Sequence, residues 1–203
     1  MDKISSIIII EDHPVVQEGI ISHFEKTGKW RITGTASNLE NAKELLTANT
    51  ADIILLDIQL ENELGLNIIP WLKQQYGHND TLPIFAVYSS YNDFVHVSAA
   101  LSKGVRVYMC KHHKLIDLEK ALYDALEGKT YIDDCVQSKL DTVADILSLL
   151  TKREKEIFAM VKSSLSNKEI AQRLDISHRT VENILSCIYD KVGVKSRQDL
   201  QRL

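Results

Sequence analysis

Three carboxylates in this chain stand directly after unbroken aliphatic runs. Glu11 and Asp12 follow the run 7–10, and Asp57 follows the run 53–56. Such runs are typical of parallel strands covered on both faces, and ligands collect outside the carboxyl ends of these strands. A lone Asp after a strand is usually a helix cap or a turn residue, but two strand ends of this kind favour a site. Three acids in one crevice repel one another unless a cation lies among them, and an oxygen-only cluster suits Mg²⁺ better than zinc.

A hydroxyl and an amine are expected at the same edge, because Ser89 and Lys111 follow two later aliphatic runs. Together with the acids they make a set suited to phosphoryl transfer. Asp57 would be the nucleophile, and Mg²⁺ would be held by Asp12 and Asp57, with Glu11 near it or bound through water. Ser89 and Lys111 would donate to phosphoryl oxygens. Taken singly, each of these two residues is more often an ordinary solvated side chain, and it is their shared location that indicates a site.

The first part of the chain alternates aliphatic runs with amphipathic stretches, which is typical of an α/β domain with a parallel sheet. The expected strands span 4–10, 30–36, 52–56, 83–88 and 105–110, and the expected helices span 14–24, 39–48, 66–76, 91–103 and 115–126. These repeats predict one doubly wound five-stranded domain over residues 1–128. Residues 129–147 form a predicted linker, and a helix over 138–149 is left open as an alternative.

Residues 148–203 have a purely helical pattern and form a predicted small all-α domain. Thr151 and Ser166 each stand three residues before a glutamate, the spacing of a capping box, in which side chain and backbone satisfy each other's free donors. Ser177 follows a turn between apolar residues. The pattern therefore predicts three helices, over 152–163, 167–174 and 178–192, with a short tail helix from Ser196.

Composition indicates an ordinary soluble globular protein, since 44% of the 203 residues are hydrophobic and 26% are charged. No apolar run approaches the roughly 20 residues that cross a bilayer, so we expect a cytoplasmic protein. The cysteines Cys110, Cys135 and Cys187 lie far apart and lack CxxC or Cys/His ligand spacing, so we expect reduced, mostly structural thiols.

Charge is divided unevenly along the chain. Residues 1–147 hold 13 Lys and Arg against 21 Asp and Glu, while residues 148–203 hold 11 against 7, giving formal charges of −8 and +4. A basic end on an acidic body suggests that this end contacts a polyanion. Chance variation in surface charge is the alternative.

Residues 1–128 resemble the receiver domain of bacterial response regulators. Glu11 and Asp12 match the acidic pair of that family and Asp57 its phospho-acceptor, while Ser89, Tyr108 and Lys111 match the switch hydroxyl, the switch aromatic and the lysine. The resemblance implies a flavodoxin-like fold with strand order 2-1-3-4-5, phosphorylation by a sensor histidine kinase, and Mg²⁺ bound by Glu11, Asp12, Asp57 and the backbone of Gln59. After phosphorylation Ser89 would be drawn inward and Tyr108 would follow.

Two stretches depart from the family pattern. His112-His113 follows the lysine where the family usually has proline, and Leu60-Glu61 replaces a common Met-Pro. We expect altered loop geometry with the acceptor chemistry intact. The histidine pair is interpreted either as a solvated pair or as a metal or pH site.

Residues 148–203 resemble the LuxR-type helix-turn-helix of the NarL/FixJ subfamily. The motifs that carry the resemblance are Leu-Thr-Lys-Arg-Glu at 150–154, Ser-Asn-Lys-Glu-Ile-Ala at 166–171, Leu-Asp-Ile-Ser at 174–177, Thr-Val-Glu-Asn at 180–183 and Lys-Val-Gly-Val-Lys-Ser-Arg at 191–197. A recognition helix of this kind lies in the major groove of double-stranded DNA. The residues expected near base edges are Glu182, Asn183, Ser186 and Cys187. The other expected DNA contacts, chiefly to phosphates, are Asn167, Lys168, Ser177, Arg179, Thr180, Lys191, Lys195 and Arg197.

These observations predict a DNA-binding response regulator of a two-component system. Mg²⁺-dependent phosphorylation of Asp57 would control dimerisation and transcription from promoter sites, and the chain would catalyse only its own phosphorylation and dephosphorylation. A small phosphatase of the haloacid dehalogenase type is one alternative, but Gln59 stands where that class has a second acid. A regulator that works without phosphorylation is the other, and the retained acidic site argues against it.

Overall fold

The computed structural model describes residues 4–76 and 81–202, and their packing divides the chain into two compact units. The first unit holds Met1–Asn92 and His96–Asp134, and the second holds Asp93–Val95 and Cys135–Leu203. Within the described residues, no helix is both long and apolar enough to cross a membrane.

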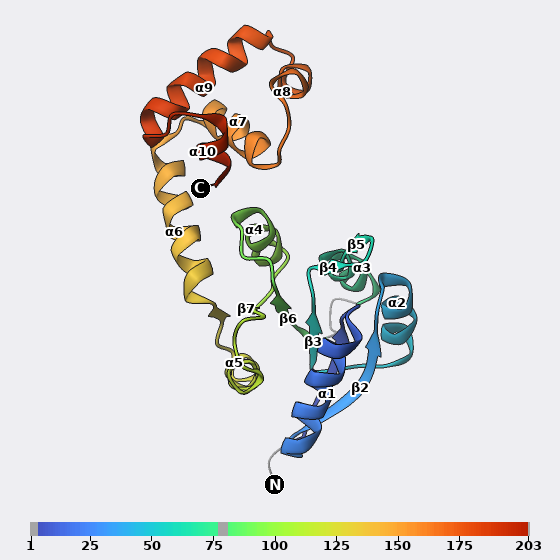
Figure 1. The fold of residues 1–203 in the computed structure, drawn as a ribbon. Coiled ribbons are helices and arrows are strands. Elements are labelled where there is room, and N and C mark those ends of the chain that lie inside the picture. The colour runs from blue at the N-terminus through green and yellow to red at the C-terminus, as the bar shows by residue number, and fades with distance from the viewer. Residues whose placement is uncertain (1–3, 77–80, 203) are drawn as a thin grey trace. The chain divides into compact units, whose positions relative to one another are not determined.

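A parallel sheet forms the centre of the first unit (Figure 1). Its strands among the described residues are β1 (Ser5–Ile10), β2 (Trp30–Ala36), β3 (Ile53–Leu56), β6 (Ile84–Ser89), β7 (Val107–Cys110) and β8 (Tyr131–Ile132). They are arranged in the order β2-β1-β3-β6-β7-β8. The expected order of the first five strands is therefore confirmed, and β8 adds a sixth strand that was not predicted.

Helices cover both faces of this sheet, as in a doubly wound fold (Figure 1). They are α1 (Pro14–Thr27), α2 (Leu39–Ala48), α3 (Ile68–Gln75), α4 (Phe94–Ser102) and α5 (Leu115–Leu126), with a 3₁₀ turn η1 (Gly65–Asn67) before α3. Right-handed crossovers put α1 on one face of the sheet and α2, α3 and α4 on the other. Helix α5 joins α1, because Ile20, Phe24, Leu118 and Leu122 share one apolar core with Ile7 of β1.

Strand register determines which residues meet at the carboxyl edge. Ile10 pairs with Leu56, and Leu56 pairs with Val87, so the residues that follow β1 and β3 emerge side by side. Ser89 in turn pairs with Cys110, the last residue of β7. Side chains at or just beyond the ends of four strands are thereby brought to one edge of the sheet.

The second unit is helical. Its helices are α6 (Asp134–Leu149, which begins at the boundary with the first unit), α7 (Lys152–Lys162), α8 (Asn167–Leu174), α9 (His178–Val192) and α10 (Arg197–Arg202). Helix α6 begins four residues before the alternative helix at 138–149. Both predicted capping boxes are confirmed: the side chains of Thr151 and Ser166 accept from backbone N–H groups, while Glu154 and Glu169 accept from the cap residues. Ile157, Ile170 and Leu185 lie in the core that joins α7, α8 and α9.

Candidate functional site

Asp57 is the centre of a polar group at the carboxyl edge of the sheet. Only 6% of the residue is exposed. Its Oδ1 accepts hydrogen bonds from the backbone N–H of Ile58 at 2.6 Å and the hydroxyl of Ser89 at 2.5 Å, and its Oδ2 accepts from the Lys111 ammonium at 2.6 Å. A buried carboxylate is tolerated because three donors satisfy its charge.

Lys111 joins this carboxylate to a second one. Its Nζ lies 2.7 Å from Glu11 Oε2 as well as 2.6 Å from Asp57 Oδ2, and Glu11 is also almost fully buried. Burial alone would lower the pKa of Lys111, but hydrogen bonds and opposite charges from Asp57 and Glu11 outweigh it and raise the pKa above its ordinary value of 10.5. The lysine therefore stays charged and offsets the repulsion between the two acids.

Asp12 completes the acidic group from a more exposed position. Its Oδ2 accepts from the backbone N–H of Glu61 at 2.9 Å, and its Oδ1 lies 2.9 Å from His13 Nδ1. One ligand atom each from Glu11, Asp12, His13 and Asp57 lie within 4.8 Å of one another. Carboxylate oxygens are hard ligands, so this group is chemically suited to a hard divalent cation. Asp12 and Asp57 face an open cavity of about 490 Å³, which Gln59 and Tyr91 also line.

A short hairpin and a glycine hold the loop after Asp57. The antiparallel pair β4 (Gln59–Leu60) and β5 (Glu63–Leu64) forms the hairpin, which the sequence did not predict. Gly65 donates its N–H to the Ile58 carbonyl at 2.7 Å, and a Cβ at position 65 would lie 2.0 Å from the Asp57 carbonyl oxygen. Only glycine permits this close approach of two backbones.

The two predicted switch residues are linked through Tyr91. Tyr108 is fully buried, and its hydroxyl donates to the Tyr91 carbonyl at 2.6 Å. The Tyr91 N–H in turn donates to Ser89 Oγ at 3.4 Å, and Ser89 donates to Asp57. Sequence analysis did not identify Tyr91 as this link. Its role as a link depends on backbone groups, which leave no signal in residue types.

In the second unit, α9 presents a polar outer face. Its exposed residues include all four of the expected base-edge residues and two of the basic ones: His178, Arg179, Glu182, Asn183, Ser186, Cys187 and Lys191. Val181, Leu185 and Ile188 are buried on the opposite side. Ser177 caps the helix by accepting from the Thr180 N–H at 3.0 Å, so both residues stand at its first turn.

Two protein-family models match the chain, one for each unit. The response regulator receiver domain matches residues 7–123, and the bacterial regulatory proteins of the luxR family match residues 148–203. The chain belongs to the NarL/FixJ family of response regulators. It is a DNA-binding response regulator.

Curated relatives align with this response regulator over most of both chains. The nitrate/nitrite response regulator protein NarL of Escherichia coli K12 is 29% identical over 202 residues, covering 95% of this chain and 91% of the relative. The DNA-binding transcriptional activator DevR/DosR of Mycobacterium tuberculosis is 25% identical, covering 94% and 89%. Among solved structures, RcsB of Salmonella enterica serovar Typhimurium bound to promoter rprA matches with a TM-score of 0.71 at 22% identity, covering 97% and 96%. At that identity the match supports the fold alone.

Three of the expected DNA contacts in this response regulator form pairs with residues far away in the sequence of its own second unit. Lys191 Nζ lies 2.9 and 2.7 Å from the two carboxylate oxygens of the buried Glu154. Arg197 donates to Asn167 Oδ1 at 2.6 Å and also to the Leu165 carbonyl. Sequence reasoning missed these pairings because the partners lie 30 or more positions apart. The phosphate contacts of Lys191, Arg197 and Asn167 stay predictions. Those of Lys168, Arg179 and Lys195, whose side chains are exposed, also stay predictions.

Proposed function

We propose that Asp57 accepts a phosphoryl group from a phosphohistidine of a sensor kinase and that this modification controls dimerisation and binding to promoter DNA. An Asp57 oxygen would attack phosphorus, the P–N bond to the kinase imidazole would break, and an acyl phosphate would form while the imidazole takes up a proton. The observation that carries the proposal is the hydrogen-bonded group of Asp57, Ser89 and Lys111 beside two further acids.

The hydrogen bonds around Asp57 favour one of its oxygens as the nucleophile. Oδ1 already accepts from Ile58 and Ser89, while among the described residues Oδ2 accepts only from Lys111. A carboxylate oxygen offers about two acceptor positions, so Oδ2 keeps one lone pair. We therefore assign the attack to Oδ2. Lys111 and Ser89 then stand where they can donate to oxygens of the incoming group.

Glu11, Asp12 and Asp57, with the backbone carbonyl of Gln59, are the proposed ligands of Mg²⁺. The three carboxylates are hard oxygen donors grouped within reach of one ion. When bound, Mg²⁺ supplies positive charge that offsets the repulsion between the acceptor carboxylate and the phosphoryl oxygens. The chain's own part is to fix the acids through the Glu61 N–H, His13 and the Lys111 ammonium.

Phosphorylation would be transmitted through Ser89, Tyr91 and Tyr108. Phosphorylation would replace the single negative charge of the Asp57 carboxylate by up to two negative charges on the phosphoryl group, and the Ser89 hydroxyl would then donate to one of its oxygens. The Tyr91 backbone joins Ser89 to the buried Tyr108, so a shift at Ser89 reaches the segment before α4. A dimer formed in response would place two copies of α9 on paired half-sites, because two-fold proteins read two-fold DNA.

We further propose that the chain turns over no outside substrate and catalyses only its own phosphorylation and dephosphorylation. Haloacid dehalogenase-like phosphatases need a second acid two residues after the nucleophile, and Gln59 occupies that position here. Its side-chain amide donates to the Leu60 carbonyl at 3.0 Å, within the hairpin that follows Asp57. This amide cannot serve as a general acid.

Labelling with a small phosphodonor and Mg²⁺ tests the acceptor. The wild-type chain should take up one hydroxylamine-sensitive phosphoryl group, and Asp57→Asn should take up none. Asp124→Asn removes a surface carboxylate that pairs with Lys129 and should label like the wild type. Equal labelling of the Asp57→Asn chain would exclude Asp57 as the acceptor.

A further inference from the structure

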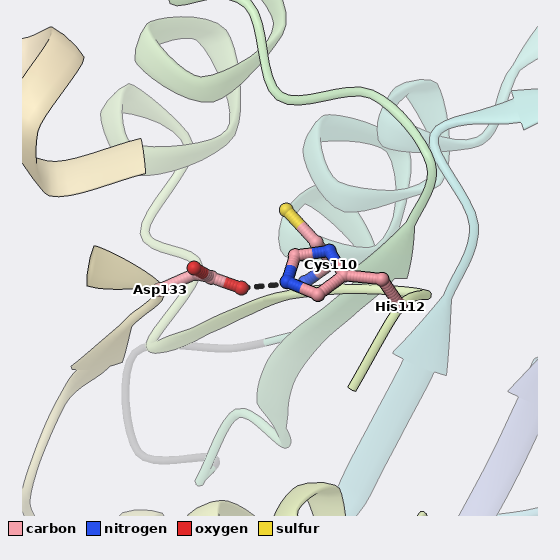
Figure 2. A group of neighbouring side chains, drawn as sticks. All are labelled: Cys110, His112 and Asp133. Carbon is pink, nitrogen blue, oxygen red and sulfur yellow. Dashed lines mark hydrogen bonds between the residues drawn. The ribbon is translucent and has the colours of Figure 1, made fainter. Parts of the chain in front are cut away.

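The two residues that flank Lys111 in the sequence belong to a second cluster of metal-binding side chains. Figure 2 shows Cys110, His112 and Asp133 gathered at one place. One ligand atom from each lies within 4.8 Å of the other two. The cluster contains a thiol, an imidazole and a carboxylate, whereas the site at Asp57 is dominated by carboxylates.

Strand pairing holds two of the three residues in fixed positions. Tyr108 of β7 pairs with Ile132 of β8, and the Asp133 N–H donates to the Tyr108 carbonyl at 2.9 Å. The Cys110 N–H donates to Asp133 Oδ2 at 3.2 Å. Cys110 and Asp133 are both 2% exposed. The thiol and the carboxylate are therefore held by backbone hydrogen bonds and kept from bulk water.

The histidine pair supplies both the third metal-binding side chain, His112, and a hydrogen-bonding partner for Asp133, His113. His112 is exposed on the turn after β7, which gives an ion a route from solvent. His113 Nε2 lies 2.7 Å from Asp133 Oδ2. A histidine on the far side of a ligating carboxylate fixes its orientation, as outer partners do at metal sites. His112, which stands where the family usually has proline, thus completes the cluster.

We propose that Cys110, His112 and Asp133 form a site for a divalent transition metal of the zinc class, with His113 positioning Asp133. Zinc accepts sulfur, nitrogen and oxygen ligands in tetrahedral geometry, and three protein ligands with one open position are a common arrangement. Tetrahedral ligands at zinc bond lengths lie about 3.4 to 3.8 Å apart, so small side-chain movements would close the site. Mg²⁺ is disfavoured, because it prefers octahedral oxygen ligands.

Occupation of this site would act on the proposed phosphoryl acceptor, and this consequence rests on the proposed function. Cys110 and His112 flank Lys111, whose ammonium contacts Asp57 and Glu11. A metal that joins both neighbours to Asp133 would immobilise the turn that carries the lysine. We therefore expect the metal to change the lifetime of the phosphoryl group on Asp57.

Cobalt titration of the metal-free full chain tests the site directly, because Co²⁺ replaces Zn²⁺ and gives a thiolate charge-transfer band. The wild type should bind one Co²⁺ with this band, and excess Zn²⁺ should remove it. Cys110→Ser should lose the band, and His112→Gln should bind Co²⁺ at least about tenfold more weakly. Cys187→Ser, which changes an exposed cysteine on α9, and Asp57→Asn should both behave like the wild type.

The proposal is overturned if the folded wild type gives no thiolate band, or if the band survives in Cys110→Ser. Cys110 is buried, so the Cys110→Ser chain could fail to fold. His112→Gln then decides the test, because residue 112 is exposed. Unchanged Co²⁺ affinity in His112→Gln also overturns the proposed site.

Phosphoryl lifetime at constant Mg²⁺ tests the consequence for Lys111. Equimolar Zn²⁺ should change the lifetime about threefold or more in the wild type and leave it unchanged in His112→Gln, which lacks a proposed metal ligand. Even the loss of an outer partner weakens metal binding about 10- to 100-fold. An equal Zn²⁺ effect in both chains would place the ion in the acidic site and refute the coupling. A chain that takes up no phosphoryl group would refute the proposed function, while the cobalt titration would still decide the metal site.

Discussion

At the scale of single residues, Lys111 determines whether two buried acids can share one pocket. Its ammonium is the only cation that the described residues place within 3 Å of both Asp57 and Glu11. Without it, the like charges of these acids would raise the free energy of both ionised carboxylates. The lysine therefore offsets the repulsion between the two carboxylates, and in the proposed reaction it would also donate to the incoming phosphoryl group.

Replacing this lysine should impair phosphoryl uptake. Lys111→Ala removes one preorganised donor from the pocket, so the initial rate of labelling from a small phosphodonor should fall about 100-fold. Lys114→Ala removes an exposed charge three residues away and should keep the wild-type rate. A Lys111→Ala chain that labels at the wild-type rate would contradict the assigned role.

Gly65 tests the backbone geometry around the acceptor. A methyl group there would meet the Asp57 carbonyl oxygen at 2.0 Å, so Gly65→Ala should destabilise the receiver by about 1–3 kcal/mol through overpacking. The measurement is urea unfolding followed by the fluorescence of Trp30 and Trp71. Gly19→Ala is the matched control, because nothing lies within 4 Å of its Cβ and the residue is inside α1. That substitution should stabilise the receiver by about 0.5–1 kcal/mol, because glycine inside a helix costs about that much relative to alanine.

At the scale of elements, the sequence predicts most where a periodic pattern and a cap coincide. Helix α2 was expected over 39–48 and spans Leu39–Ala48, with Asn38 as its cap. Thr151 and Ser166 were identified as caps from one spacing each, because capping is a local interaction between residues three apart. Strands β1, β3, β6 and β7 were each recognisable as aliphatic runs, although their ends shifted by one or two residues.

Elements and contacts without a local pattern escaped prediction. Strand β8 and the β4–β5 hairpin have two residues per strand, too few to show any periodicity. At the candidate site, the edge location of Asp57, Ser89 and Lys111 followed from strand ends alone. The gathering of Asp133 with Cys110 and His112 did not, because it depends on the pairing of β8 with β7.

The pairing of α7 with α9 through Glu154 and Lys191 gives the helical unit a pH-dependent contribution to stability. Hydrogen bonds from Lys191, followed by the Thr151 N–H, lower the pKa of Glu154 from 4.5 to about 2. A carboxyl whose pKa is lowered by folding stabilises the fold above its unfolded pKa, and that stabilisation is lost as the pH falls through the folded value. The contribution should therefore be complete above about pH 4.5 and disappear towards pH 2.

Lys191→Met tests this pairing. At neutral pH it should speed hydrogen exchange in α7 and α9 about fivefold, equivalent to about 1 kcal/mol for a charged hydrogen bond that partly faces solvent. The ratio of the exchange rate in Lys191→Met to that in the wild type at the same pH should approach one as the pH falls from 4.5 towards 2. Lys195→Met removes an exposed lysine of the same unit and should change exchange little. A ratio for Lys191→Met that is independent of pH would exclude the ion pair as its cause.

At the scale of the whole molecule, negative charge is concentrated in the part of the chain that contains the receiver, and positive charge in the part that contains α9. The acidic part of the chain, with a formal charge of −8, contains the receiver, and the basic end, with +4, contains the exposed face of α9. DNA repels the first and attracts the second, so a single contact surface is favoured electrostatically. Lys191 and Arg197 take part in internal pairs. Among the described residues, Lys168, Arg179 and Lys195 are the basic members of the expected set that are exposed and outside these pairs.

The salt dependence of DNA binding tests this division. Each lysine or arginine that neutralises a phosphate adds about 0.9 to the slope of log affinity against log salt concentration. Lys168→Ala and Arg179→Ala should therefore each reduce the slope by about 1 and weaken binding to all duplexes alike, as measured by fluorescence anisotropy over a series of salt concentrations. Lys26→Ala makes the same change in net charge on an exposed receiver helix, and its slope should match the wild type. If Lys26→Ala flattens the slope as much as Arg179→Ala does, net charge governs the binding and α9 has no special part in it.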